Sequence, residues 1–127
     1  MQWINTYLLP YQKLDCSAID LYAARCGLLH TLSPHSKLTA EHKARKICWA
    51  WGTASLQDLK TEIQKTKEED LYVTVHVNEL VTEMSNAVDR FLEELIKNPE
   101  RLKLAEEKAN HFFEEISSEM MTKLAET

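Results

Sequence analysis

Two side chains with the chemistry of a catalytic pair stand on one apolar stretch of the sequence. Arg25 and His30 lie five positions apart within residues 21–30, which carry no other ionisable side chain except Tyr22 and Cys26. Arg and His are costly to bury, so both must find partners or face a groove. An imidazole can exchange a proton near neutral pH, and a guanidinium offers phosphate oxygens a permanent charge and a planar fork. The pair therefore predicts proton transfer at a phosphodiester.

Basic residues gather close to this pair. Residues 1–67 hold nine Lys/Arg and five Asp/Glu, a net charge of +4, whereas residues 68–127 hold six and fifteen, a net charge of −9. The total of −5 argues against bulk nucleic-acid binding, but a local basic patch can still contact a phosphate backbone. The alternative is an ordinary solvated helix face. The residues that we expect to bind RNA are Lys37, Lys43, Arg45 and Lys46.

Composition favours helices as the scaffold for these residues. The chain has 127 residues, enough for one domain with a real core, and only two Gly and three Pro. Scarce Gly and Pro, with abundant Ala, Leu, Glu and Lys, favour helices over a sandwich or barrel. We therefore predict an all-α fold, a single helical domain over residues 1–127 formed by a bundle of five or six helices.

Caps and prolines place the individual helices. Ser17 and Asp20 have capping-box spacing and predict a helix to about Leu32, ended by Ser33 before Pro34. Thr39 is expected to cap a second helix over residues 40–51, with Gly52 as its left-handed end, and Ser55 caps a third. Further helices are expected over residues 1–9, 79–97 and 99–124.

The last two helices are long and closely joined. Asn98 and Pro99 form a cap followed by proline at the first helical position, so an antiparallel hairpin is expected. Apolar side chains recur along both helices at helical spacing, Phe91 and Phe112 among them. We predict that this hairpin is the stability core.

A short segment at residues 71–77 departs from the helical pattern. Three valines alternate with Tyr72, Thr74 and His76, which is strand periodicity. A lone strand leaves its backbone polar groups unpaired. The segment must therefore pair with another extended segment, add to a partner chain, or connect two helices in extended form. In a protein predicted to be helical, we favour the connector.

The spacing of the Arg and the His matches a known helical family. The segment Arg25-Cys26-Gly27-Leu28-Leu29-His30 resembles the Arg-x4–6-His motif of the HEPN superfamily, which comprises small all-helical domains. Many members are metal-independent RNases that act as dimers with a shared cleft. The resemblance implies that His30 is the acid/base and that Arg25 binds phosphate. Residues 20–31 also resemble a group of uncharacterised bacterial proteins.

The HEPN resemblance implies a function and partners. It implies an endoribonuclease or RNA-binding protein of a bacterial toxin or defence system, with RNA, a second copy and an antitoxin-like protein as partners. The number of large apolar side chains also favours a homodimer, because one bundle cannot hide them all. The alternative function is a non-enzymatic, self-associating helical interaction module.

Other kinds of site are not indicated. His30, His35 and His42 lie close together in sequence, but their spacing is not that of a zinc site, so we predict no metal and no cofactor. Glu93-Glu94 and Glu106-Glu107 alternate with apolar residues as a solvated helix face does.

The location of the protein is expected from its cysteines and its apolar runs. Three cysteines in apolar surroundings indicate reduced, buried thiols of a cytoplasmic protein. No membrane contact is expected, because no apolar run approaches the ~20 residues that span a bilayer. No signal peptide is recognised, and the abrupt apolar start suggests that the native chain begins upstream of Met1.

Overall fold

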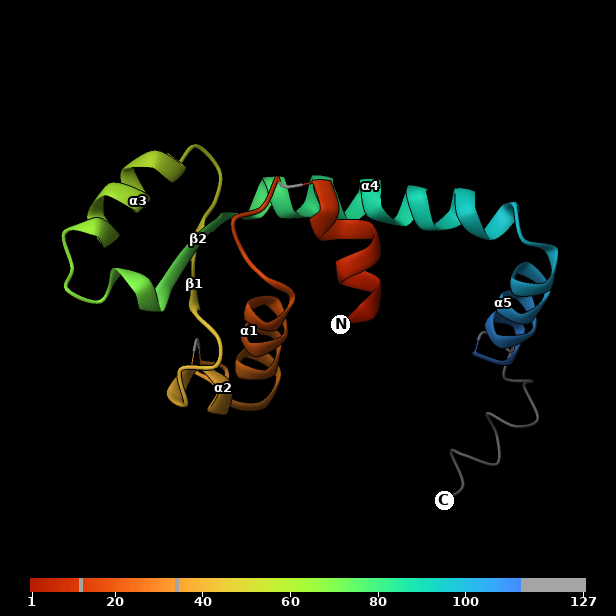
Figure 1. Cartoon of the computed structure of the whole chain (residues 1–127), viewed down its shortest axis with the longest axis horizontal. Coiled ribbons are helices and arrows are strands. Elements are labelled where there is room, and N and C mark those ends of the chain that lie inside the picture. The colour runs from red at the N-terminus through yellow and green to blue at the C-terminus, as the bar shows by residue number, and fades with distance from the viewer. Residues whose placement is uncertain (12, 34, 113–127) are drawn as a thin grey trace, which may run out of the picture. The chain divides into compact units, whose positions relative to one another are not determined.

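The computed structural model describes residues 1–11, 13–33 and 35–112 (Figure 1). Its contacts divide the chain into two compact units, Met1–Arg90 and Phe91–Thr127, which are described separately below. The first unit contains all the residues that the sequence singles out for chemistry.

A β-α-β element lies at the centre of the first unit. Strand β1 (Lys46–Ala50) pairs in parallel with strand β2 (Tyr72–His76), from Lys46 opposite Tyr72 to Ala50 opposite His76. Parallel strands cannot be joined by a tight turn, so the chain crosses between them through helix α3 (Leu56–Gln64) and the short 3₁₀ helix η3 (Glu69–Leu71). Within the described residues the sheet has these two strands.

The prediction of an all-α bundle is therefore wrong. Residues 40–51 do not form a helix, because helix α2 (Lys37–Ala40) is capped by Ser36 and ends at once. The chain then turns at His42, which has a left-handed φ of 54°, and enters β1. Gly52 does adopt the expected left-handed conformation, but it follows a strand. Ile47 and Trp49 suit a pleated, half-buried surface better than a helix.

Within the extended segment predicted at residues 71–77, residues 72–76 likewise form a true strand and not a connector. Of the three arrangements that its alternation left open, pairing with another extended segment is the one observed. The pairing satisfies backbone groups that a connector would leave to water.

Two layers of helix enclose the sheet. Ile47, Val73 and Val75 form a buried cluster with Cys16. Helix α1 (Ala18–Thr31) packs on this cluster through Leu21 and Ala24, and helix α4 (Val77–Ile96) packs on it through Leu80. Helix α3 packs against both strands, which lie between α3 and α1 in Figure 1. Burial of each large aliphatic side chain contributes roughly 1.5–3 kcal/mol.

The start of the chain is held against α4. Two short helical turns, η1 (Ile4–Leu8) and η2 (Leu9–Tyr11), bury Tyr7 and Leu8. The Arg90 guanidinium donates a hydrogen bond to the Tyr7 carbonyl oxygen at 3.0 Å and lies 3.4 Å from the centre of the Tyr11 ring. Stacking of a guanidinium on an aromatic face adds to the hydrogen bond.

Helix α1 begins and ends with strong local signals. The predicted capping box between Ser17 and Asp20 is present, with both reciprocal hydrogen bonds. At the other end Leu32 adopts a left-handed φ of 49° and its N–H reaches the Gly27 carbonyl. A Cβ on Gly27 would lie 2.5 Å from the Ser33 carbonyl oxygen, so only glycine lets the chain fold back this closely.

The second unit does not bear out the predicted core. Helix α5 (Pro99–Phe112) starts at the expected proline, but it contains no buried residue. Phe112 is 81% exposed, so its predicted role in the core is wrong. Residues 113–124 of the helix predicted over 99–124 lie outside the described residues. Arg101 bonds Glu94 at 2.9 Å.

Among the helices of the described part, none combines the length and the apolar character needed to cross a membrane.

We predict that Leu32→Gly stabilises the protein. A non-glycine residue in the left-handed region costs about 1–2 kcal/mol, and glycine removes this strain. Part of the stabilisation is offset by the greater conformational freedom of glycine in the unfolded chain. The free energy of unfolding should rise by about 0.5–1 kcal/mol in urea titrations.

Leu28→Gly is the matched control for Leu32→Gly. Leu28 is also exposed but lies inside α1, so the same substitution should lower the free energy of unfolding by about 1 kcal/mol. Equal effects of the two substitutions would contradict the assignment of strain to Leu32.

Candidate functional site

Arg25 and His30 both lie on α1 with exposed side chains. Neither side chain forms an ion pair or hydrogen bond with another described residue. Five residues along an α-helix correspond to about 140° of rotation and about 7.5 Å of rise. The two side chains therefore leave α1 in different directions, and neither lines any of the three cavities considered below. One chain does not bring them together in a single cleft.

Two of the basic residues expected to bind RNA share one acidic partner. The Nζ of Lys43 lies 2.7 Å from Glu41, and that of Lys37 lies 3.8 Å from the same carboxylate. These side chains are exposed, and exposed ion pairs contribute at most about 1 kcal/mol. Both lysines remain accessible, but Glu41 offsets part of their positive charge.

Lys46 is the first residue of β1 and is half-buried. Its ammonium group lies 5.5 Å from the centre of the Tyr72 ring, at the opposite position in the sheet register. The contact is a cation–π interaction and ties the first residues of the two strands together.

Arg45 has a structural partner that sequence reasoning did not foresee. Its backbone N–H donates to Asp20 Oδ1 at 2.7 Å, and its Nε and Nη2 groups donate to Asp20 Oδ2 at 3.2 and 2.7 Å. The Ser17 N–H donates to the same oxygen at 2.9 Å. Asp20 is 1% exposed, so this is a buried carboxylate fully supplied with donors.

The titration behaviour of this region follows from the geometry. Burial alone raises the pKa of Asp20, but the N–H donors of Ser17 and Arg45 outweigh it and hold the pKa below the ordinary value of 3.8. Burial, helped by the charge of Asp20, raises the pKa of the neighbouring Cys16 thiol to about 11. Cys16 therefore stays a protonated thiol near neutral pH, which excludes it as a nucleophile there.

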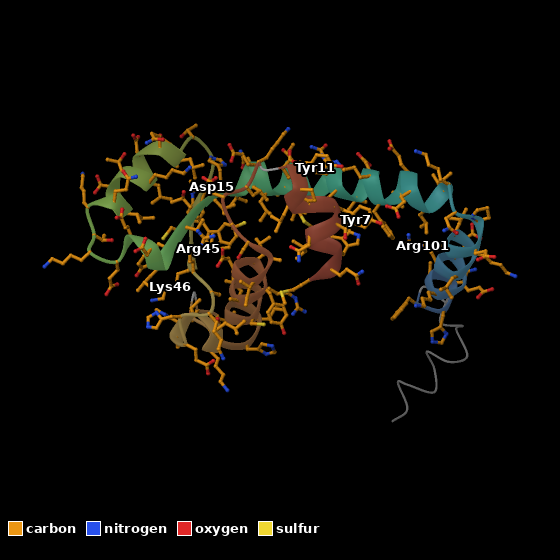
Figure 2. All side chains as sticks on the ribbon, viewed as in Figure 1. Tyr7, Tyr11, Asp15, Arg45, Lys46 and Arg101 are labelled. Carbon is orange, nitrogen blue, oxygen red and sulfur yellow. The ribbon has the colours of Figure 1, made fainter. Side chains whose placement is uncertain are left out.

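Two adjoining cavities open beside the Asp20–Arg45 pair. One, of about 250 Å³, lies at the start of β2, and we name it the strand-start cavity. The other, of about 190 Å³, shares Arg45 and Asp70 with it. Figure 2 shows Asp15 and Arg45 near the strands, and Lys60 of α3 forms an ion pair with Asp15. The lining of the strand-start cavity includes Asp15, Arg45, Lys60, Glu69, Asp70 and Thr74.

A third cavity, of about 500 Å³, lies beside the first turns of α4 and is lined by Lys13 and Glu83 among others. Glu83 is buried; its Oε1 lies 3.4 Å from Lys13 Nζ and accepts a hydrogen bond from Asn86 at 3.2 Å. Its Oε2 lies 3.8 Å from Arg90 and has no hydrogen bond. Because this Oε2 atom is also shielded from solvent, it is not exposed to the cavity.

Metal chemistry has no visible basis in the described part of the chain. No group of three or more His, Cys, Asp or Glu side chains is placed there to hold a metal ion. The three cysteines are free, and of these Cys16 is buried whereas Cys26 and Cys48 are partly exposed. The prediction of buried thiols therefore holds only for Cys16.

Comparison with family models, with curated proteins and with solved structures finds no match to this chain.

Sequence reasoning missed three residues that line the strand-start cavity, Asp15, Lys60 and Thr74. The alternation of residues 71–77 marked Thr74 as a strand residue, but its place in a cavity depends on the crossover through α3. No local spacing links Asp15 to Lys60, which lies 45 positions away.

We predict that Asp20→Asn destabilises the protein by about 2–4 kcal/mol in urea titrations. The substitution removes a cap and leaves the Arg45 guanidinium without its charged partner. The matched control is Asp58→Asn, at the same third position of α3, where no buried partner is involved. It should change the free energy of unfolding by less than about 1 kcal/mol.

The pH dependence gives an independent readout of the same carboxylate. Because the pKa of folded Asp20 is lowered, its contribution is complete above the ordinary value of 3.8 and is lost as the pH falls through the folded pKa. The wild type should lose stability over this acid range more steeply than Asp20→Asn. Parallel curves for the two proteins would show that Asp20 is not held as described.

Proposed function

We propose that the chain is a non-enzymatic interaction domain that associates with a second copy of itself through the exposed face of α1. The observation that supports this proposal is that α1 is apolar on both sides. Its inner side packs on the sheet through Leu21 and Ala24. Its outer side exposes Leu29 at 63%, and Leu32, directly after the helix, is 91% exposed. A helix that is apolar all round is normally covered.

The outer side chains form one strip along the helix. Tyr22 and Leu29 are seven residues apart, which is close to two full turns, so they lie nearly in line. Cys26 lies between them and is partly exposed. An exposed strip of this kind marks an interaction surface rather than an ordinary scatter of apolar residues.

A second copy is the partner that suits this strip best. A two-fold interface places the same patch on both sides, so the patch must be complementary to itself. An apolar strip meets this condition, and it contains no acidic residue that an identical copy would repel. Arg25 borders the strip, and its long side chain can keep its charge in water while its methylene groups pack.

We predict a dimer in sedimentation equilibrium that Leu29→Asp weakens at least tenfold. The substitution buries an unpaired charge in each half of the interface. The matched control is Leu104→Asp, which changes another exposed leucine, on α5, and should leave the dimer unchanged. A wild type that stays monomeric at high micromolar concentration, or a Leu29→Asp variant that dimerises normally, would contradict the proposal.

Metal-independent RNA cleavage is the second candidate function. It is favoured by the exposure of Arg25 and His30, which have no ionic partner among the described residues. Pairing of two α1 helices would bring two such pairs to one interface, as the HEPN resemblance implies. His30 would then take a proton from the attacking ribose hydroxyl, and Arg25 would stabilise the charge on the phosphate.

For this second function we predict that His30→Ala lowers RNA cleavage by roughly 10²–10⁴-fold, because it removes the general acid/base. Arg25→Lys should fail as well, since a point charge does not replace a two-pronged contact. The assay uses single-stranded and structured RNA, with and without EDTA, and His111→Ala as the control. Cleavage that survives in His30→Ala, or is abolished by EDTA, would count against this mechanism.

A further inference from the structure

Helix α4 carries apolar side chains on its solvent side as well as on its inner side. The inner side packs on the core through Leu80 and also buries Ala87. On the solvent side Val81 is 62% exposed, Met84 is 39% exposed and Val88 is 41% exposed. We name these three residues the α4 strip. They are three and four positions apart, so they lie along one line on the helix.

The helical conformation of α4 does not require this strip. Valine is a weaker helix former than the Glu, Gln and Lys residues that suit exposed helix positions. In the part of α4 that belongs to the second unit, Leu92 and Ile96 continue the same spacing and are also exposed. Apolar side chains that recur on an exposed helix face indicate a surface for a partner.

The spacing of the α4 strip decides the shape of that partner. Side chains three and four residues apart form the ridges by which one α-helix packs against another. The complementary surface is therefore a second helix with an apolar side of its own.

Acidic side chains near the α4 strip decide the charge of the partner. Asp89 directly follows Val88, and Glu79 lies near the start of α4; both are exposed. Neither carboxylate forms an ion pair or hydrogen bond with another described residue. Residues 77–89 contain no Lys or Arg, so the same part of α4 in a second copy would bring only like charge. The anionic surface of a membrane would be repelled as well, whereas basic residues supply the opposite charge.

We infer that the α4 strip is a docking surface for an amphipathic helix of a partner protein, whose apolar side is bordered by Lys or Arg. The apolar side chains of that helix cover Val81, Met84 and Val88, and its basic side chains pair with Asp89. This surface is separate from the outer face of α1 and does not depend on self-association through it.

The experiment is a fluorescence-anisotropy titration of the full chain into a labelled synthetic helix of leucine and lysine, in which leucine recurs every three or four residues. Saturable binding is expected. Val88→Gln should weaken it about tenfold, because a polar amide replaces an apolar contact without a change in charge. Asp89→Asn should weaken it about threefold, since an exposed ion pair contributes little. The matched control is Leu104→Gln, which changes an exposed leucine on α5 and should leave the affinity within about twofold.

Two comparison peptides test the shape and the charge of the partner. One carries glutamate in place of every lysine, and the other has the original composition in an order that forms no apolar side. Absence of saturable binding by the first peptide, or equally tight binding by either comparison peptide, would overturn the inference. So would an equal loss of affinity in Val88→Gln and Leu104→Gln.

Two further measurements keep the outcome unambiguous. Val81→Gln, at the most exposed position of the α4 strip, takes the place of Val88→Gln if that variant does not fold. Sedimentation equilibrium of the same variant should show unchanged self-association. Loss of self-association would mean that a second copy covers the α4 strip, and the inference of a basic partner helix would then be wrong.

Discussion

The buried ion pair between Asp20 and Arg45 is the contact on which the first unit depends. Asp20 ends the first turn of α1 and Arg45 immediately precedes β1, so the pair fixes where the strand begins relative to the helix. Removal of one partner of such a pair destabilises the protein by far more than the intact pair stabilises it, because the other charge is left buried and unpaired. The position of the sheet on α1 is therefore set by electrostatics as well as by apolar packing.

The position of the sheet on α1 affects both the outer face of α1 and the strand-start cavity. With the inner side of α1 against Ile47 and the two valines of β2, the opposite side of the helix is left uncovered, and the apolar strip is there. Arg45 also lies at the strand-start cavity, where its charge is offset by Asp20. The other cation of that lining, Lys60, is offset by Asp15.

Sequence patterns predicted local features well and long-range ones poorly. The capping residues Ser17 and Ser55 and the proline start of α5 were read correctly, because each depends on residues a few positions apart. Residues 46–50 were misread as helix because a short, mainly apolar run fits either state, and only pairing with β2 decides between them. For the same reason the pairing of Arg45 with Asp20 was not foreseen, because the two residues lie 25 positions apart.

The parallel pairing of the strands also governs the order in which the chain can assemble. β1 finds no neighbour until the whole of α3 and η3 has been synthesised and folded back, because the crossover separates it from β2. Long-range pairing of this kind is slow, because the entropy cost of closing the intervening segment as a loop comes before any stabilising contact between the strands. During that delay Ile47 and Trp49 lie on an unpaired strand, so the nascent protein passes through a stage in which it is open to aggregation.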